Sequence, residues 1–150
     1  MTDSDKEFKD PLDRFLDGEE GVSEFEELYS FLPADLSEHN SWAAVSRIEK
    51  FLGEIQKHFE SEEETVFLAV ETADAPEDLK ALVARLRKEH KEILERSAML
   101  KELLSEEVFP MDDEALGKAN VLYELFKGRL LLHAKLEDES LYPHIKPYLR

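Results

Sequence analysis

The sequence contains no cysteine, so the 150-residue chain can form neither a disulfide nor a thiolate metal site. Any metal ion would have to be bound by histidine and carboxylate side chains. The sequence also lacks a run that approaches the ~20 apolar residues of a transmembrane helix, and its amino-terminal residues are polar and acidic. We therefore expect a cytoplasmic protein that does not enter a membrane.

Positively charged residues are few, because 19 lysines and arginines stand against 36 aspartates and glutamates, for a formal net charge of −17. Such a surface repels phosphate backbones, and the basic residues are scattered among acids, so we expect no nucleic-acid partner. The excess of acid accounts first for solubility, and it could also recruit cations.

No stretch of the sequence sustains the alternation of apolar and polar residues that is typical of a half-buried β-strand. Apolar residues instead recur at intervals of three and four through four long segments, which predicts an all-α protein. Short connections favour antiparallel neighbours, so we expect residues 1–150 to form a single up-down-up-down antiparallel four-helix bundle. The helices are expected at about 10–32, 41–71, 76–105 and 112–142, the last ending before Pro143.

Two of the expected helices carry the same His-x-x-x-Glu pattern, His58 with Glu62 and His133 with Glu137. A spacing of four places the two side chains of each pair on one face of a helix, where one metal ion can touch both. Both pairs lie on the apolar stripe of their helix, and a buried ionised carboxylate costs several kcal/mol unless a charge or hydrogen bond compensates it. One pair alone could be a structural contact. Two matched pairs indicate a shared cation.

A third histidine, His90, lies on the apolar face of the expected helix 76–105, together with Leu86 and Ile93. Taken alone, His90 could be a core histidine held by one hydrogen bond. Beside the two His-Glu pairs, we interpret it as a further metal ligand.

The two halves of the chain form an approximate repeat, because in each half a His-x-x-x-Glu helix follows a helix that can offer one more ligand. His90 precedes His133 by 43 residues, so its counterpart in the first half should fall near residues 15 to 20. Aligning the two halves places Glu19 at that position. Glu19 is therefore the candidate ligand of the first helix, and a solvated or capping role is its alternative.

Glycines on both sides of Glu19 complicate this assignment. Gly18 and Gly21 each cost about 1 kcal/mol in a helix interior, and they could loosen the turn enough to present Glu20 instead. Tyr29 is a further conceivable ligand, about two turns along the helix.

Together these residues resemble the hemerythrin-like, HHE cation-binding domain family over essentially the whole chain. The resemblance is carried by Asp10-Pro11-Leu12, His58-Phe59-x-x-Glu62-Glu63 with Val66-Phe67, Glu89-His90, and His133-x-x-x-Glu137 with Leu141-Tyr142-Pro143. It implies two iron ions bridged by Glu62 and Glu137, with His90 and His133 on one ion and His58 on the other. The family normally completes the second ion with a histidine on the first helix, where this sequence aligns Glu19.

The resemblance implies a non-haem di-iron protein that reacts with or senses dioxygen or peroxide as its small-molecule ligand. Because an anionic oxygen ligand favours ferric iron, we expect oxidation or sensing rather than reversible carriage of dioxygen. An iron-responsive regulatory binding module without turnover is the alternative, and a scaffold that has lost its metal is a third. Manganese and zinc accept the same ligand types. The sequence assigns neither an enzymatic activity nor a protein partner.

Overall fold

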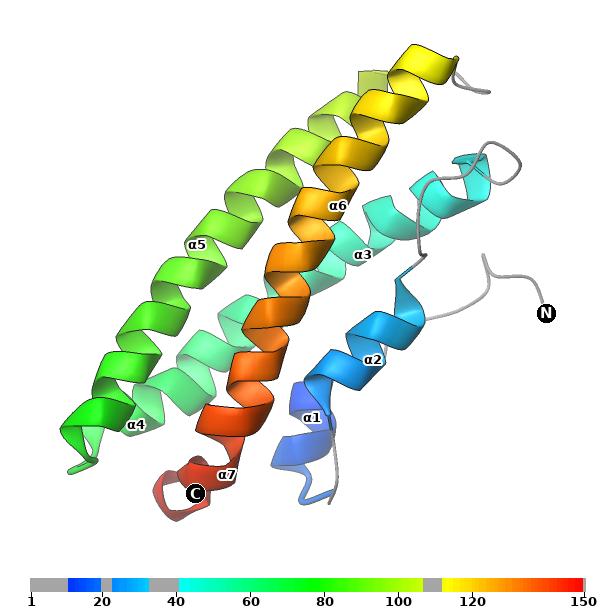
Figure 1. The fold of residues 1–150 in the computed structure, drawn as a ribbon. Coiled ribbons are helices and arrows are strands. Elements are labelled where there is room, and N and C mark those ends of the chain that lie inside the picture. Colours follow the sequence, from blue (N-terminus) through cyan, green and yellow to red (C-terminus); the bar gives the residue numbers. More distant parts are fainter. Residues whose placement is uncertain (1–10, 20–22, 33–40, 107–111, 150) are drawn as a thin grey trace.

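A computed structural model describes residues 11–19, 23–32, 41–106 and 112–149, and the regular structure within these ranges is helical, as the sequence predicts (Figure 1). Among these residues, no helix combines the length and the apolar character that crossing a membrane requires. The elements are α1 (Pro11–Leu16), α2 (Glu24–Phe31), α3 (Ser41–Glu62), η3 (Glu63–Phe67), α4 (Leu68–Thr72), α5 (Glu77–Glu106), α6 (Asp113–Leu136), η4 (Glu137–Leu141), α7 (Tyr142–Ile145) and η5 (Lys146–Tyr148).

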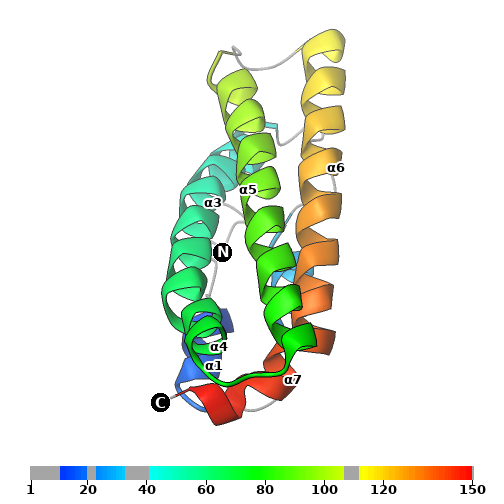
Figure 2. The same ribbon diagram turned by 90° about the vertical axis from the view of Figure 1, so that its left-hand side faces the viewer.

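The long helices lie alongside one another in an arrangement compatible with a four-helix bundle. α5 and α6 run side by side over most of their length (Figures 1 and 2). α3 continues through the π-helical turn η3 into α4, and both pack against α5. α2 packs against α6, and α1 packs against α2.

The first expected helix, 10–32, is broken in the structure, and residue 10 lies outside the described residues. α1 ends in a Schellman motif, in which the N–H of Gly18 donates to the carbonyl of Phe15 (3.0 Å) and the N–H of Glu19 to that of Arg14 (3.1 Å). Gly18 has φ of +86°, a conformation that glycine adopts without steric cost. Ser23 then caps α2 by accepting a hydrogen bond from the N–H of Glu26.

The last expected helix, 112–142, begins as predicted with Asp112, whose side chain accepts a hydrogen bond from the N–H of Ala115. It does not end before Pro143. The π-helical turn η4 closes at Leu141, a new turn starts at Tyr142, and Pro143 occupies the first turn of α7, where its missing N–H removes no helical hydrogen bond.

Two apolar clusters form the core, and a polar layer separates them. The larger cluster joins α2, α3, α5 and α6, and the smaller one joins α1, η3, α4, the first half of α5, η4 and α7. Between Phe59 and Val66 on one side, and between Ala134 and Leu141 on the other, the buried positions are glutamates. The polar layer therefore lies inside the bundle at the level of the two π-helical turns.

The left-handed conformation of Gly18 yields a test of the first-helix break. Gly18→Ala is expected to lower the free energy of unfolding by about 1 kcal/mol, because a Cβ atom is strained at positive φ. Gly53→Ala is the control, since Gly53 is exposed within α3 and a methyl group there would meet no atom within 4 Å, so this change should stabilise the helix. Urea denaturation measures both, and equal effects of the two substitutions would contradict the motif.

Candidate metal centre

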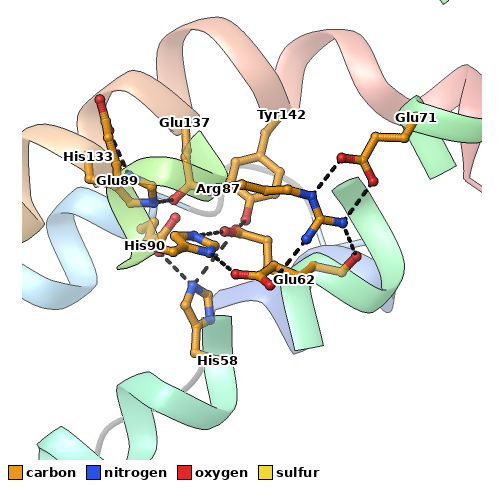
Figure 3. A network of polar contacts seen from close by, with 11 residues as sticks. His58, Glu62, Glu71, Arg87, Glu89, His90, His133, Glu137 and Tyr142 are labelled. Carbon is orange, nitrogen blue, oxygen red and sulfur yellow. Dashed lines mark hydrogen bonds and ion pairs between the residues drawn. The ribbon is translucent and has the colours of Figure 1, made fainter. Parts of the chain in front are cut away.

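The polar layer consists of six buried titratable side chains from four segments of the chain, whose polar atoms lie close together. Figure 3 shows the three histidines of this layer and two of its glutamates pointing toward one another. α2 contributes a glutamate, α3 a histidine and a glutamate, α5 a histidine, and the end of α6 with η4 a histidine and a glutamate. They are Glu24, His58, Glu62, His90, His133 and Glu137, and each is at most 2% exposed. Apolar side chains surround them above and below.

The π-helical turns aim both His-x-x-x-Glu motifs into this layer. Buried residues follow each motif at steps of four, as His58, Glu62, Val66 and Val70 on one helix and as His133, Glu137, Leu141 and Ile145 on the other. In an α-helix each step of four turns the side chain by about 40°, so a row of four would drift away from the core. A turn widened to i→i+5 hydrogen bonding, as in η3 and η4, absorbs this drift and keeps each row buried.

Four of the six residues form the first candidate set of ligands: Glu62, His90, His133 and Glu137. Nε2 of His90 lies 2.8 Å from Oε1 of Glu62, and Nε2 of His133 lies 3.0 Å from Oε1 of Glu137. Despite these distances, none of the four atoms has a partner in hydrogen-bonding geometry among the residues that the structure describes, and Oε2 of Glu137 also has none there. The donor atoms thus converge without satisfying one another.

Glu24, His58 and Glu62 form the second candidate set. Nε2 of His58 lies 2.7 Å from Oε1 of Glu24 and 3.9 Å from Oε2 of Glu62. Oε2 of Glu24 is buried without a hydrogen-bond partner. The hydroxyl of Tyr142 donates a short hydrogen bond to Oε2 of Glu62. Glu62 belongs to both sets, so its carboxylate joins them.

The electrostatics of the layer show that its negative charges need compensation. Burial, and then the charges of Glu24 and Glu62, raise the pKa of Glu137 well above its usual range. Burial alone would also raise the pKa of Glu62, but the close approach of Glu137 and His90 and the charges of the imidazoles outweigh it, so the pKa of Glu62 is lowered. Opposite shifts of this kind favour one protonated and one ionised carboxyl group when no cation lies between the two. A metal ion between them would replace that proton.

The two histidines of the first set are oriented from behind by a second row of acids. Nδ1 of His90 lies 2.8 Å from Oε2 of Glu63, and Nδ1 of His133 lies 2.9 Å from Oε1 of Glu89. A neutral ring that donates its Nδ1–H to such a carboxylate presents the lone pair of Nε2 to the centre, as a metal ligand does. The hydrogen bond with His133 also lowers the pKa of Glu89.

Arginine holds one of these outer acids in place. Arg87 donates to Oε1 of Glu63 (3.2 Å) and makes two hydrogen bonds with the carboxylate of Glu71 (2.6 and 2.8 Å). Phe59 stacks on the imidazole of His90 at a centroid distance of 3.8 Å, and Phe67 lies 5.0 Å from the same ring. The position of His90 is therefore fixed both by charge and by packing.

The structure does not bring Glu19 into the layer. Its side chain is 48% exposed and forms an ion pair with Arg14 at 2.7 Å, because the break at Gly18 turns the chain away before residue 19. Tyr29 is 64% exposed and also lies outside the layer, and Glu20 lies outside the described residues. The acid that enters the layer from this part of the chain is Glu24.

A signal for Glu24 is present in the sequence. Ser23 followed by Glu26 is the start of a capping box, which restarts the helix after the glycines. Counting from that restart, Glu24 lies on the same face as Leu28 and Phe31, and both of these are buried. If one uninterrupted helix is assumed from residue 10 onward, the apolar face is counted from the wrong starting point and the position of Glu24 on it is missed.

Asp138 anchors α2 beside the layer. One of its oxygens accepts from the N–H of Glu24 (3.0 Å), and the other accepts from the N–H of Phe25 (2.9 Å) and the hydroxyl of Ser23 (3.0 Å). An acid at a helix N-terminus satisfies backbone donors and interacts favourably with the helix dipole. Asp138 follows Glu137 directly in the sequence. The turn η4 therefore both positions Glu24 of α2, through Asp138, and contributes Glu137 to the layer.

The donor atoms of the layer fit a metal ion. If each imidazole carries its proton on Nδ1, the lone pairs of Nε2 in His90 and His133 face carboxylate oxygens at about hydrogen-bonding distance, an arrangement that requires a proton or a cation between them. Imidazole nitrogen and carboxylate oxygen are the ligand types of iron, manganese and zinc sites.

Comparison with known proteins identifies the same kind of site. The model of the hemerythrin HHE cation binding domain matches residues 6–145. No curated protein and no solved structure matches the chain. Because the matched region covers nearly all of the sequence and contains the whole buried histidine and glutamate cluster, the protein belongs to the hemerythrin HHE cation-binding domain family.

Proposed function

We propose that the protein binds two iron ions in the polar layer and uses them to react with or sense dioxygen or peroxide. Glu62, His90, His133 and Glu137 would hold one ion, and Glu24, His58 and Glu62 the other. The observation that carries the proposal is the carboxylate of Glu137, fully buried with both oxygens unpartnered, next to unpartnered imidazole nitrogens. Short connections favour bundle helices of alternating direction, so the second and fourth helices would run the same way. Both His-Glu motifs would then lie at one level of the bundle.

The two ligand sets, which share Glu62, support two ions rather than one, and the charge of the layer is compatible with two. Glu24, Glu62 and Glu137 supply three negative charges, which offset three of the four positive charges of two divalent ions. The remaining charge can be balanced by a small anion derived from an oxidant. Zinc accepts the same ligand types but has no redox chemistry, and iron is proposed over manganese because the family resemblance implies iron.

Two ferrous ions that share carboxylates supply two electrons to dioxygen or peroxide when bound. The chain's own residues set the conditions for that chemistry. Phe59 and Phe67 cover His90 and exclude water from that side of the layer. Tyr142 fixes one oxygen of Glu62 with its hydroxyl proton, and burial followed by the charges of the surrounding acids raises the pKa of Tyr142 well above its usual range, so it stays a donor.

The position of Glu24 indicates the kind of reaction. The family resemblance implies a histidine on the first helix, and this chain brings a carboxylate to His58 from that segment. An anionic oxygen ligand stabilises ferric more than ferrous iron. We therefore propose irreversible oxidation or sensing in preference to reversible carriage of dioxygen.

Removal of the Glu24 carboxylate tests the second ion. Glu24→Gln is expected to reduce the bound iron from about two ions per chain to about one, because that ion loses its anionic ligand from α2. Glu19→Gln is the matched control, since Glu19 is exposed and paired with Arg14, and it should leave the iron content unchanged. Metal analysis after anaerobic reconstitution measures both variants. Loss of iron in both variants, or in neither, would contradict the assignment.

Removal of the Glu137 charge tests the electrostatic basis of the site. In the metal-free protein at neutral pH, Glu137→Gln should raise the free energy of unfolding by about 1–3 kcal/mol, because burial raises the pKa of Glu137 and folding therefore requires uptake of a proton there, whereas the amide is neutral in both states. The same substitution should reduce the stabilisation that iron produces. Glu139→Gln, at an exposed position in the same turn, should change neither the stability of the metal-free protein nor the stabilisation by iron. A destabilised metal-free Glu137→Gln protein would argue against a buried charge in need of a cation.

Exposure of the anaerobic ferrous protein to dioxygen, and separately to peroxide, tests the reaction. The expected result is oxidation to a ferric form whose absorption spectrum does not revert when oxygen is removed, with consumption of the oxidant. A spectrum that returns fully to the ferrous form on deoxygenation would establish carriage instead and overturn the proposed reaction.

A regulatory binding module is the second candidate, and the position of Glu24 favours it. The site would join α2 to α3 through Glu24 and His58, while Asp138 already joins α2 to η4, so metal occupancy would fix α2 against the rest of the bundle. A large iron-dependent rise in melting temperature without consumption of oxidant would support this candidate over the oxidation reaction.

A further inference from the structure

The outward face of α6 carries a stripe of uncharged residues that the metal centre does not use. Val121 is 60% exposed, Leu125 48% and Leu132 70%, and they share one face of the helix with Gly117 and Gly128. The stripe is about 22 Å long. Figure 2 shows α6 at an edge of the molecule, and the exposed fractions of these side chains show that no other described element covers the face. Exposed large apolar residues in such a row mark interaction sites more often than isolated ones do.

The two glycines of the stripe have no explanation inside the monomer. Both are exposed residues in the interior of a long helix, where glycine is unfavourable relative to alanine. A methyl group built on either of them would meet no atom within 4 Å, so no neighbouring element of the described chain requires their small size. Close approach of a second molecule would require it.

The stripe is complementary to itself when the helix is paired with a reversed copy. With a two-fold axis between Glu124 and Leu125, Gly117 faces Leu132 of the partner subunit, and Val121 faces Gly128 of the partner subunit. Val121 and Leu132 thus each meet a glycine, and Leu125 lies next to the axis, close to Glu124 and Leu125 of the partner subunit, so the surface is complementary to itself as an isologous contact requires. We propose that the protein forms a homodimer in which the α6 helices of two copies pack antiparallel along this stripe.

Charge in the same register supports a second copy as the occupant. The arrangement that pairs the glycines with large residues also places Glu114 opposite Lys135 of the partner subunit, once on each side of the axis. Glu114 is 82% exposed and has one intramolecular ion pair, to Lys118 at 3.6 Å. Between residues 115 and 136 the sequence has a single acid, Glu124, in a chain with 36 acids, so this helix brings few negative charges into the contact between two molecules of charge −17.

A groove lies where the proposed dimer needs to receive a side chain. It has a volume of about 650 Å³, and its lining includes Leu103, Gly117, Val121 and Leu122 together with the charged residues Asp113, Glu114 and Lys118. In the antiparallel pair, Leu132 of the partner subunit faces Gly117 and would enter this groove. The contact extends over about 31 Å from Glu114 to Lys135, which is a small interface, so we expect a reversible dimer with a dissociation constant in the micromolar range.

Sedimentation velocity over a concentration series tests self-association of the full-length protein. The wild type is expected to shift from monomer to dimer as concentration rises. Gly128→Leu should raise the dissociation constant at least ~tenfold, because it blocks the site of Val121 from the partner. Gly53→Leu, on exposed α3 with equally open surroundings, should leave it unchanged. Circular dichroism verifies that both variants are folded.

Charge reversal tests the register. Glu114→Lys and Lys135→Glu should each raise the dissociation constant roughly tenfold, since each places two like-charged pairs in the dimer, and the double variant should return close to the wild-type value. Rescue of this kind requires that the two residues face each other across the interface. Single reversals that weaken the dimer without rescue in the double variant would overturn the register.

Cross-linking tests the direction of the helices, because the chain has no native cysteine. Leu125→Cys should form an intermolecular disulfide under mild oxidation, since the two copies of residue 125 lie near the axis. Gly117→Cys should not, because its two copies would lie ~22 Å apart in the antiparallel pair, well beyond disulfide reach. Efficient cross-linking through Gly117→Cys would indicate parallel helices. A protein that stays monomeric at all concentrations would also overturn the proposal and leave the stripe to a different partner.

Discussion

The structure depends on placing three carboxylates and three imidazoles inside an apolar core. Each of Glu24, Glu62 and Glu137 comes from a different segment, and each is withdrawn from water at a cost that only a proton or a cation can offset. The remaining features of the layer serve this arrangement. The π-helical turns direct the glutamates inward, and the outer acids Glu63 and Glu89 orient the imidazoles.

The layer also explains how the bundle is held together at its middle. Apolar clusters pack above and below it, but the contact between α2 and the rest of the layer is polar, through the Glu24 carboxylate at His58 and the backbone of α2 at Asp138. A bundle whose first segment is joined in this way is sensitive to what occupies the layer. Stability and metal content are therefore two measures of the same interaction.

Much of this arrangement could be predicted from the sequence, and the exceptions have physical causes. Apolar periodicity indicates the all-helical class, and the burial of His58, Glu62, His90, His133 and Glu137 follows from their positions on apolar stripes. The repeat alignment points to Glu19 as the acid of the first segment, because it assumes an unbroken helix. The left-handed Gly18 instead ends α1 and resets the register, so that Glu24 enters the layer. The π-helical turns, and the continuation past Pro143, leave no clear local signal, because they arise from the packing of side chains at steps of four against the core.

The central claim is that two cations flank the carboxylate of Glu62 and neutralise the buried acids. Anomalous diffraction at the iron absorption edge, on crystals of the iron-reconstituted protein, tests it most directly. The account predicts two peaks in the polar layer, one beside His90 and His133 and the other between Glu24 and His58. An anomalous map without a peak in this layer, with Glu62 and Glu137 joined by a shared proton, would contradict it.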